Sequence, residues 1–149
     1  MSGVHIRAAI AQDEAQWRVL WQRYNVFYHA PDLPEAATNA TWARILDTQS
    51  AIGCIVAEDN GKLLGFINYV IHPRTWDARD ACYMEDLYVD EAARGKGVAK
   101  RLCADLKALC VQEGLSRIYW HTQEGNATAR RLYDAIGTKD DFVHYVMPL

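Results

Sequence analysis

The chain has 149 residues, of which 50% are hydrophobic and 23% are charged, and its formal net charge is −3. This size and composition are typical of one globular domain, so we expect a single domain over residues 1–149. The mildly acidic balance argues against a protein that binds nucleic acid or an anionic membrane. Because no segment approaches the roughly 20 apolar residues of a membrane span, and the N-terminus lacks a signal-peptide core, we expect a soluble cytoplasmic protein.

The cysteines and histidines show no pattern of disulfide pairs or metal ligands. The four cysteines are widely spaced, with no Cys-x-x-Cys pair: Cys54, Cys82, Cys103 and Cys110. Cys103 and Cys110 lie on one predicted helix, about 10 Å apart along its axis, which is too far for a disulfide. None of the five histidines has a spacing such as His-x-x-x-His. We therefore expect free, mostly buried thiols and no metal site.

Hydrophobic periodicity, turn residues and helix caps predict alternating strands and helices. In chain order they are a strand at 5–9, a helix from 11 to about 29, a helix at 35–49, strands at 52–57, 63–71 and 81–89, a helix from 98 to about 114, a strand at 117–122, a helix from 126 to about 136 and a final strand at 142–147. Asn60-Gly61 predicts a hairpin between the second and third strands. In the second helix we expect Trp42, Ile45 and Leu46 to face the core. The order β-α-α-β-β-β-α-β-α-β predicts an α/β fold with a mixed sheet.

Residues 83–102 are the most informative stretch, since they predict a strand, a glycine-rich turn and the start of a helix. The backbone amides of residues 95–99 can converge on an anion there, and the positive end of the helix dipole adds to the attraction. Four basic side chains lie in or beside the turn: Arg94, Lys96, Lys100 and Arg101. The turn therefore predicts a phosphorylated ligand.

Three phosphate-binding patterns can be compared with this turn. A Walker loop requires Ser or Thr after its lysine, but Lys96 is followed by Gly97 and Lys100 by Arg101. A dinucleotide-binding fingerprint requires a small residue where Lys100 stands. The pattern Arg/Gln-x-x-Gly-x-Gly/Ala fits Arg94-Gly95-Lys96-Gly97-Val98-Ala99 without gaps.

With this loop the sequence resembles the GNAT superfamily of N-acetyltransferases, in which such a loop holds the pyrophosphate of acetyl-coenzyme A. Residues 85–89 look like the family's splayed fourth strand, and Asn126-x-x-Ala129-x-x-Leu132-Tyr133 looks like its later coenzyme-binding helix. The resemblance implies a GNAT-like, mainly antiparallel sheet flanked by helices, with acetyl-CoA as cosubstrate and no metal. The coenzyme contacts that it implies are Leu87, Tyr88, Val89, Arg94, Gly95, Lys96, Gly97, Val98, Ala99, Lys100, Asn126, Ala129 and Tyr133.

The resemblance also implies two catalytic residues. Tyr133 matches the family tyrosine that protonates the departing thiolate, although its helical spacing also fits a core tyrosine. Glu85 is the best-placed base for the amine, although a surface carboxylate has the same pattern. Regular strand alternation predicts that Glu85 shares a face with Leu87, whereas Asp86 points the other way. Asn126 is either a coenzyme contact or only a helix cap.

Aromatic and acidic residues predict a pocket for an alkylammonium group. The candidate acceptor-binding residues are Tyr28, Asp32, Trp76, Glu85 and Trp120. Each tryptophan alone also fits a core position. The sequence looks most like the small-amine, polyamine and fungal histone/D-amino-acid branch. We therefore expect direct acetyl transfer to a primary amine of a polyamine, diamine or amino acid. A protein-lysine or histone acetyltransferase and a non-catalytic acyl-CoA sensor remain the alternatives.

The C-terminal tail is short, because the chain after Gly137 has room for one clear strand where many members of that family have two. A sheet edge with a missing strand invites pairing with another chain. We therefore expect a homodimer in which a second subunit completes the sheet edge.

Overall fold

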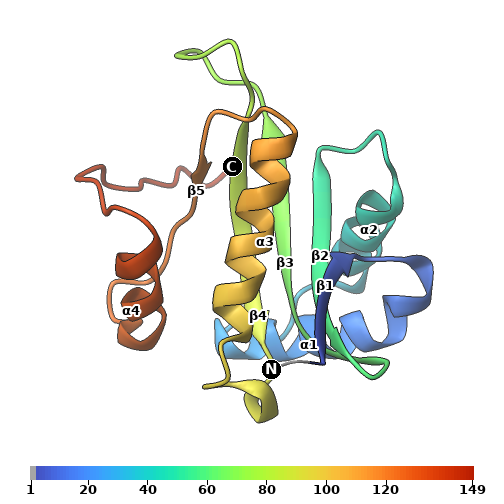
Figure 1. Cartoon of the computed structure of the whole chain (residues 1–149). Helices are drawn as coiled ribbons and strands as arrows, with labels where there is room; N and C mark the ends of the chain where they lie inside the picture. Colours follow the sequence, from blue (N-terminus) through green and yellow to red (C-terminus); the bar gives the residue numbers. More distant parts are fainter. Residues whose placement is uncertain (1–2) are drawn as a thin grey trace.

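The computed structural model describes residues 3–149 and contains one five-stranded sheet in the order β1-β2-β3-β4-β5 (Figure 1). The strands are β1 (Val4–Ala8), β2 (Ile52–Asp59), β3 (Lys62–His72), β4 (Ala81–Val89) and β5 (Ile118–Tyr119). The helices are α1 (Glu14–Phe27), α2 (Glu35–Leu46), α3 (Val98–Gln112) and α4 (Ala127–Ile136), with short 3-10 turns at Ala11–Asp13 and Glu91–Ala93. The first four strands pair antiparallel and β5 pairs parallel to β4, which confirms the predicted mixed, mainly antiparallel α/β fold.

Helices cover both faces of the sheet (Figure 1). On one face α1 and α2 bury a cluster that includes Trp17, Trp42 and Phe66. On the other face α3 packs Leu102 and Leu106 against the strands. The helix α4 stands to the side, next to β5 (Figure 1). The candidate site therefore lies where α1, β4, β5 and α4 approach one another.

An aromatic ladder runs along α1 from the core toward β4. Trp17, Trp21, Tyr24 and Tyr28 follow one another at helical spacing, and their successive ring centroids are 5.4, 5.3 and 4.8 Å apart. Trp17 is fully buried, whereas Tyr24 and Tyr28 are only partly buried. The helical spacing that places the tryptophans in the core therefore also places the hydroxyl groups of Tyr24 and Tyr28 near the end of α1.

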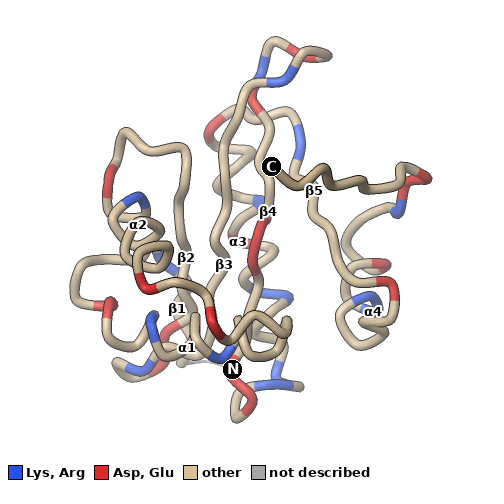
Figure 2. Tube along the Cα trace, turned by 180° about the vertical axis from the view of Figure 1, so that it is seen from behind, with Lys and Arg blue, Asp and Glu red and all other residues tan. Residues whose placement is uncertain are grey.

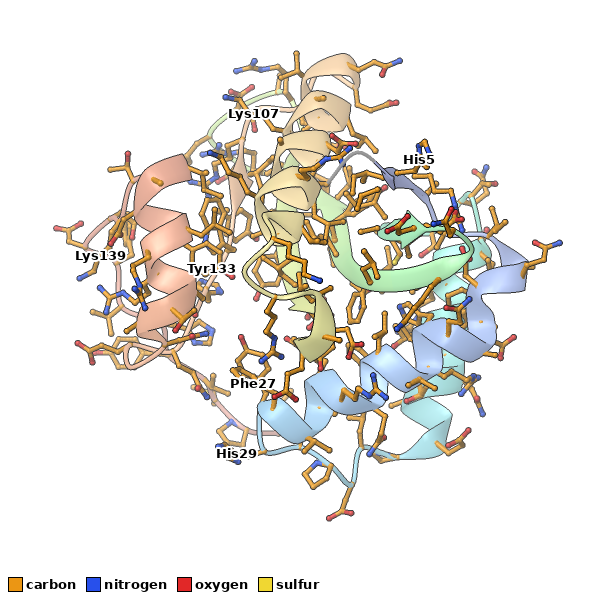
Figure 3. The ribbon with its side chains drawn as sticks, turned by 60° about the horizontal axis from the view of Figure 1, so that its bottom comes forward. His5, Phe27, His29, Lys107, Tyr133 and Lys139 are labelled. Carbon is orange, nitrogen blue, oxygen red and sulfur yellow. The ribbon has the colours of Figure 1, made fainter. Side chains whose placement is uncertain are left out.

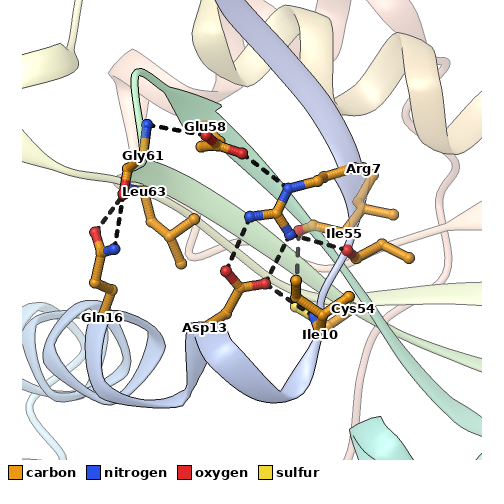
Figure 4. A network of polar contacts seen from close by, with 10 residues as sticks. Arg7, Ile10, Asp13, Gln16, Cys54, Ile55, Glu58, Gly61 and Leu63 are labelled. Carbon is orange, nitrogen blue, oxygen red and sulfur yellow. Dashed lines mark hydrogen bonds and ion pairs between the residues drawn. The ribbon is translucent and has the colours of Figure 1, made fainter.

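A polar network fixes the first strand to the start of α1 (Figure 4). The buried carboxylate of Asp13 accepts two hydrogen bonds from Arg7, at 2.7 and 2.9 Å, and a third from the amide of Ile10. Arg7 also pairs with Glu58 on β2 at 2.9 Å. These contacts hold the pKa of Asp13 below its ordinary value, chiefly through the Arg7 hydrogen bonds.

Replacing Asp13 should therefore destabilise the fold in a pH-dependent way. We expect Asp13→Asn to cost about 1–3 kcal/mol of unfolding free energy at pH 7. Because the folded pKa is depressed, the Asp13 contribution is complete above the unfolded pKa and is lost as pH falls through the folded pKa. Urea unfolding measures the free energy of unfolding of both proteins. The difference between wild type and Asp13→Asn should become smaller below about pH 4. Asp105 is exposed, so Asp105→Asn is the control. An equal loss of unfolding free energy in both variants would contradict a stabilising role for the Asp13 contacts.

The hairpin and the buried thiols confirm sequence predictions, whereas one residue of α2 does not. Asn60 and Gly61 have φ values of 49° and 80°, as the predicted hairpin turn requires. The four cysteines are buried and free, as predicted. In α2, Trp42 is buried and Ile45 is partly buried, but Leu46 is 40% exposed, so the prediction for Leu46 was wrong. Among residues 3–149, no helix is long and apolar enough to cross a bilayer.

The C-terminal region departs most from the prediction. The strand predicted at 117–122 is formed only at Ile118–Tyr119. The final strand predicted at 142–147 is not formed, and residues 138–149 are all exposed, without helix or strand. A strand needs a neighbour for its backbone hydrogen bonds, and this segment has none among residues 3–149.

Candidate active site

The glycine-rich turn has the geometry of an anion site. Gly95 and Gly97 adopt φ values of 76° and 78°, a region in which a side chain is strained. Helix α3 begins directly after Gly97, so its first amides and its dipole point at the turn. Within residues 3–149, no backbone amide from Gly95 to Lys100 has a hydrogen-bond acceptor. These unsatisfied donors fit the pyrophosphate of a coenzyme.

Arg94 anchors the start of this turn. Its guanidinium lies 5.7 Å from the ring centroid of Phe27 and 5.4 Å from that of Tyr88. Its Nε donates a hydrogen bond to the Val89 carbonyl at 3.0 Å. Arg94 therefore ties the turn to α1 and β4, whereas Lys96 remains exposed beside the free amides.

The strands β4 and β5 separate after a short contact. They pair only through Cys82 with Ile118 and Tyr83 with Tyr119. β4 continues to Val89, while β5 ends at Tyr119. The edge of β4 beyond Tyr83 thus lacks a neighbouring strand, which is the splay predicted for residues 85–89. Backbone groups on this edge are available to bind the arm of a coenzyme.

Helix α4 brings Asn126 and Tyr133 to the opposite side of this opening. Asn126 caps the helix, because its Oδ1 accepts a hydrogen bond from the Ala129 amide at 3.4 Å. Its side chain lies close to Tyr28 at the end of α1, where burial raises the pKa of the phenol and Asn126 opposes that shift. The cap prediction is confirmed, whereas a contact of Asn126 or Ala129 with a coenzyme stays a prediction.

Tyr133 is a partly buried phenol that packs beside Trp120. Its ring centroid lies 5.4 Å from that of Trp120, and it projects from the side of α4 that faces α3 (Figure 3). Burial, together with the nearby Tyr28 and Cys103, raises the pKa of Tyr133 above its ordinary value. The hydroxyl therefore stays protonated at neutral pH. The partial burial of Tyr133 also accords with a packing role.

A β-bulge corrects the prediction for the two acidic residues of β4. Asn68 of β3 pairs with Asp86 and the next residue, Tyr69, pairs with Met84, so Glu85 is an extra residue in the ladder. Met84 and Leu87 both pack in the core on the α3 side of the sheet. The two residues between them therefore both face α1, and Glu85 does not share a face with Leu87. The prediction that Asp86 points away from Glu85 was wrong because a bulge breaks strand alternation.

The carboxylate of Asp86 is held beneath α1 by two partners. Asn68 Nδ2 donates to Asp86 Oδ2 at 3.1 Å, and Tyr24 lies close to the same carboxylate. Burial raises the pKa of Asp86, although Tyr24 and Asn68 oppose that shift. Desolvation, followed by the charge of Asp86, raises the pKa of Glu85. A raised pKa brings Glu85 closer to the value that suits a general base at neutral pH.

Comparison with known proteins identifies the family. The sequence profile of the acetyltransferase (GNAT) family matches residues 14–137. The chain belongs to the GNAT acetyltransferase family. It is 34% identical to the D-amino-acid N-acetyltransferase HPA3 of Saccharomyces cerevisiae over 142 residues, which cover 94% of this chain and 88% of HPA3. The family assignment makes the protein an N-acetyltransferase that depends on acetyl-CoA.

This GNAT protein is also similar to one further enzyme in sequence and to one solved structure in fold. The thialysine N-epsilon-acetyltransferase of Bos taurus is 28% identical over 95 residues, which cover 58% of this chain and 55% of that enzyme. The fold is similar to that of the aminoglycoside N-acetyltransferase AAC(6')-Iy in complex with CoA, with a TM-score of 0.82 and 22% identity, covering 97% of this chain and 94% of that structure. At that identity the second comparison supports the GNAT fold alone.

The predicted acceptor residues of this GNAT domain do not all gather in one place. Tyr28 lies beside Asn126, and Glu85 lies on the same face as Asp86. Asp32 lies in the exposed loop between α1 and α2, and within residues 3–149 it has neither a hydrogen bond nor an ion pair. Trp76 is 82% exposed and lines, with Trp120 and residues 142–145, a groove to which Tyr28 does not contribute.

Sequence reasoning missed three members of this GNAT site. Tyr24 and Asn68 were not among the predicted site residues, and Asp86 was placed on the wrong face. Asn68 carried a usable signal, since a polar residue in the middle of an apolar strand usually has a specific partner. Tyr24 lies one helical turn before Tyr28, and this spacing puts both on one side of α1.

Proposed function

We propose that this GNAT protein transfers the acetyl group of acetyl-CoA directly to a primary amine of a small molecule in a ternary complex. The observation that carries the proposal is the meeting of three features at one opening of the sheet. These are the unpaired amides after Arg94, the free edge of β4, and the partly buried phenol of Tyr133 near Tyr28. Relatives named for D-amino acids and thialysine support a small amine as the acceptor.

Each part of the site has a proposed role. The amides and basic side chains of residues 94–100 hold the coenzyme phosphates, and the backbone of Leu87, Tyr88 and Val89 orients the pantetheine arm. Acetyl-CoA supplies the acetyl group as a thioester. The carboxylate of Glu85 accepts a proton from the amine, directly or through water, and the hydroxyl of Tyr133 donates a proton to the departing sulfur.

The test is a panel of amines incubated with the protein and acetyl-CoA while free thiol is measured. The panel contains diamines, polyamines, free amino acids of both configurations, and a lysine-containing histone peptide. We expect saturable thiol release with small amines. Turnover of the peptide alone would instead indicate a protein-lysine acetyltransferase. Saturable binding of acetyl-CoA without thiol release from any acceptor would indicate a non-catalytic sensor.

We also propose that the protein is a homodimer in which the C-terminal segment of each copy packs on the other. Residues 142–149 expose most of their apolar side chains; Phe142, Tyr145 and Met147 are 80%, 89% and 85% exposed. The outer edge of β5 has no neighbouring strand among residues 3–149. The outer edge of β5 in one copy can pair with residues 142–149 of a second copy, and the reverse contact forms at the same time.

Sedimentation tests the dimer. We expect the full chain to sediment at twice its 16.9 kDa mass at micromolar concentration. A variant that ends at Asp141 should sediment as a monomer and keep its secondary structure. A monomeric full chain, or a dimer that survives the truncation, would contradict the proposal.

A further inference from the structure

We propose that Arg23 and Phe27 on α1 are positioning residues for the coenzyme turn, because they hold the segment that leads from β4 into it. The inference rests on the proposed binding of CoA by residues 94–100 and adds two residues outside that turn. Arg23 and Phe27 lie one helical turn apart, so both project from one side of α1. Acidic and basic positions lie close together where α1 approaches the connection between β4 and α3 (Figure 2). One surface hollow there is lined by Arg23, Phe27, Tyr88, Asp90 and Arg94, among others.

The first contact is an ion pair with a buried carboxylate. Asp90 directly follows β4 and is 7% exposed, and its Oδ1 accepts a hydrogen bond from Arg23 Nη1 at 2.7 Å. The Asp90 amide donates to the Leu64 carbonyl at 2.7 Å, which fixes the same residue to β3. Without Arg23, a buried negative charge would stand uncompensated in the segment that leads to the phosphate site. That charge would displace Asp90 toward water and repel an approaching anion.

The second contact holds the other end of this segment. The guanidinium of Arg94 lies over two rings, 5.7 Å from the centroid of Phe27 and 5.4 Å from that of Tyr88. Tyr88 is 7% exposed and belongs to the core, whereas Phe27 is 48% exposed. Phe27 therefore buries little surface, and its ring serves mainly to orient the guanidinium through a cation–π contact. An exposed phenylalanine at the end of an amphipathic helix has a specific role here.

The two contacts together fix the backbone just before the glycines. The Ala93 amide donates to the Asp90 carbonyl at 2.8 Å, and this short 3-10 turn couples the position of Asp90 to that of Arg94. Gly95 and Gly97 follow directly, with the conformational freedom that positive φ values require. Their amides converge on one point only while the segment before them is held in place. A preorganised turn binds phosphate without the cost of ordering, so loosening the segment should reduce affinity for CoA.

The experiment measures the dissociation constant of CoA by calorimetric titration. We expect Arg23→Met to weaken binding about tenfold, because it leaves the buried Asp90 carboxylate unpaired. Phe27→Leu keeps an apolar side chain but removes the ring, and it should weaken binding about fivefold. The conservative variants Arg23→Lys and Phe27→Tyr keep the charge and the ring, so both should bind CoA within about threefold of wild type.

Two substitutions elsewhere on α1 are the matched controls. Arg18→Met removes a cation that pairs with Glu14 at 2.9 Å and with Glu35 at 3.3 Å. Val19→Ala truncates an apolar side chain that is 50% exposed, similar to Phe27. Both control variants should bind CoA as wild type does. Thermal unfolding of all the variants shows whether any loss of affinity comes with a loss of stability.

A double-mutant cycle and steady-state rates separate positioning from a general structural role. If Phe27 acts through Arg94, Phe27→Leu should change CoA affinity by less than about twofold in a protein that already carries Arg94→Met. Arg23→Met and Phe27→Leu should raise KM for acetyl-CoA and change kcat at saturating acetyl-CoA by less than about twofold.

The outcomes separate this inference from the proposed function. A wild type that binds CoA, together with Arg23→Met and Phe27→Leu variants that bind it equally well, would overturn the inference alone. An undiminished effect of Phe27→Leu in the Arg94→Met protein would also overturn it, since Phe27 would then not act through Arg94. A wild type that does not bind CoA would overturn the proposed function and the inference with it.

Discussion

Gly97→Val should weaken coenzyme binding about 100-fold, equivalent to about 2.7 kcal/mol. Gly97 has φ 78°, so a β-branched side chain forces the turn into another conformation. The rearrangement turns the free amides before α3 away from their common point, and the new side chain occupies the space through which phosphate approaches. Calorimetric titration with CoA measures the loss directly.

Gly61→Val is the matched control for this substitution. Gly61 has φ 80°, and a Cβ there meets no atom within 4 Å, as at Gly97. It lies in the β2–β3 hairpin, outside the turn formed by residues 94–100. Both variants carry the same kind of backbone strain and should lose similar thermal stability, but only Gly97→Val should lose affinity for CoA. Equal CoA affinity in the two variants would show that the turn does not bind the phosphates.

Tyr133→Phe should lower kcat about 100-fold while KM for acetyl-CoA changes by less than about threefold. The substitution keeps the ring that packs on Trp120 and removes only the proton donor. The pKa of Tyr133 is raised by burial, so the wild-type hydroxyl stays protonated through neutral and mildly alkaline pH. Steady-state rates with a saturating amine measure the effect.

Tyr69→Phe is the corresponding control for Tyr133. Tyr69 is also partly buried, and desolvation raises its pKa to about 12, but it lies on β3 and packs on the α3 side of the sheet. Its variant should keep nearly full kcat. If Tyr133→Phe also keeps nearly full kcat, Tyr133 is a core tyrosine and another group protonates the thiolate.

Local sequence signals predicted the turns and the helix cap that surround the proposed coenzyme site. The glycine turn, the cap at Asn126 and the Asn60-Gly61 hairpin depend on backbone preferences of a few neighbouring residues. Such preferences are properties of the residue types themselves. The start of α3 after the glycine turn and the start of α4 at Asn126 were predicted from these preferences, and the start of α4 places Tyr133 on that helix.

The acceptor half could not be predicted in the same way. The bulge at Glu85 arises from pairing between β3 and β4, and regular alternation gives no sign of it. Asp32 and Trp76 were grouped with the pocket by residue type, but both stand in exposed loops whose course no local pattern fixes. The segment at 142–147 has the alternation of a strand and still lacks a partner strand in the described part of the chain. Strand formation depends on a neighbour, which a sequence pattern does not supply.

Initial rates of thiol release, with acetyl-CoA and cadaverine varied together, test the central claim most directly. Direct transfer in a ternary complex predicts release that requires both compounds, saturates with each, and gives intersecting reciprocal plots. It also predicts one acetylated cadaverine for each thiol released. Thiol release no faster than hydrolysis with cadaverine and with every other primary amine in the panel would contradict it.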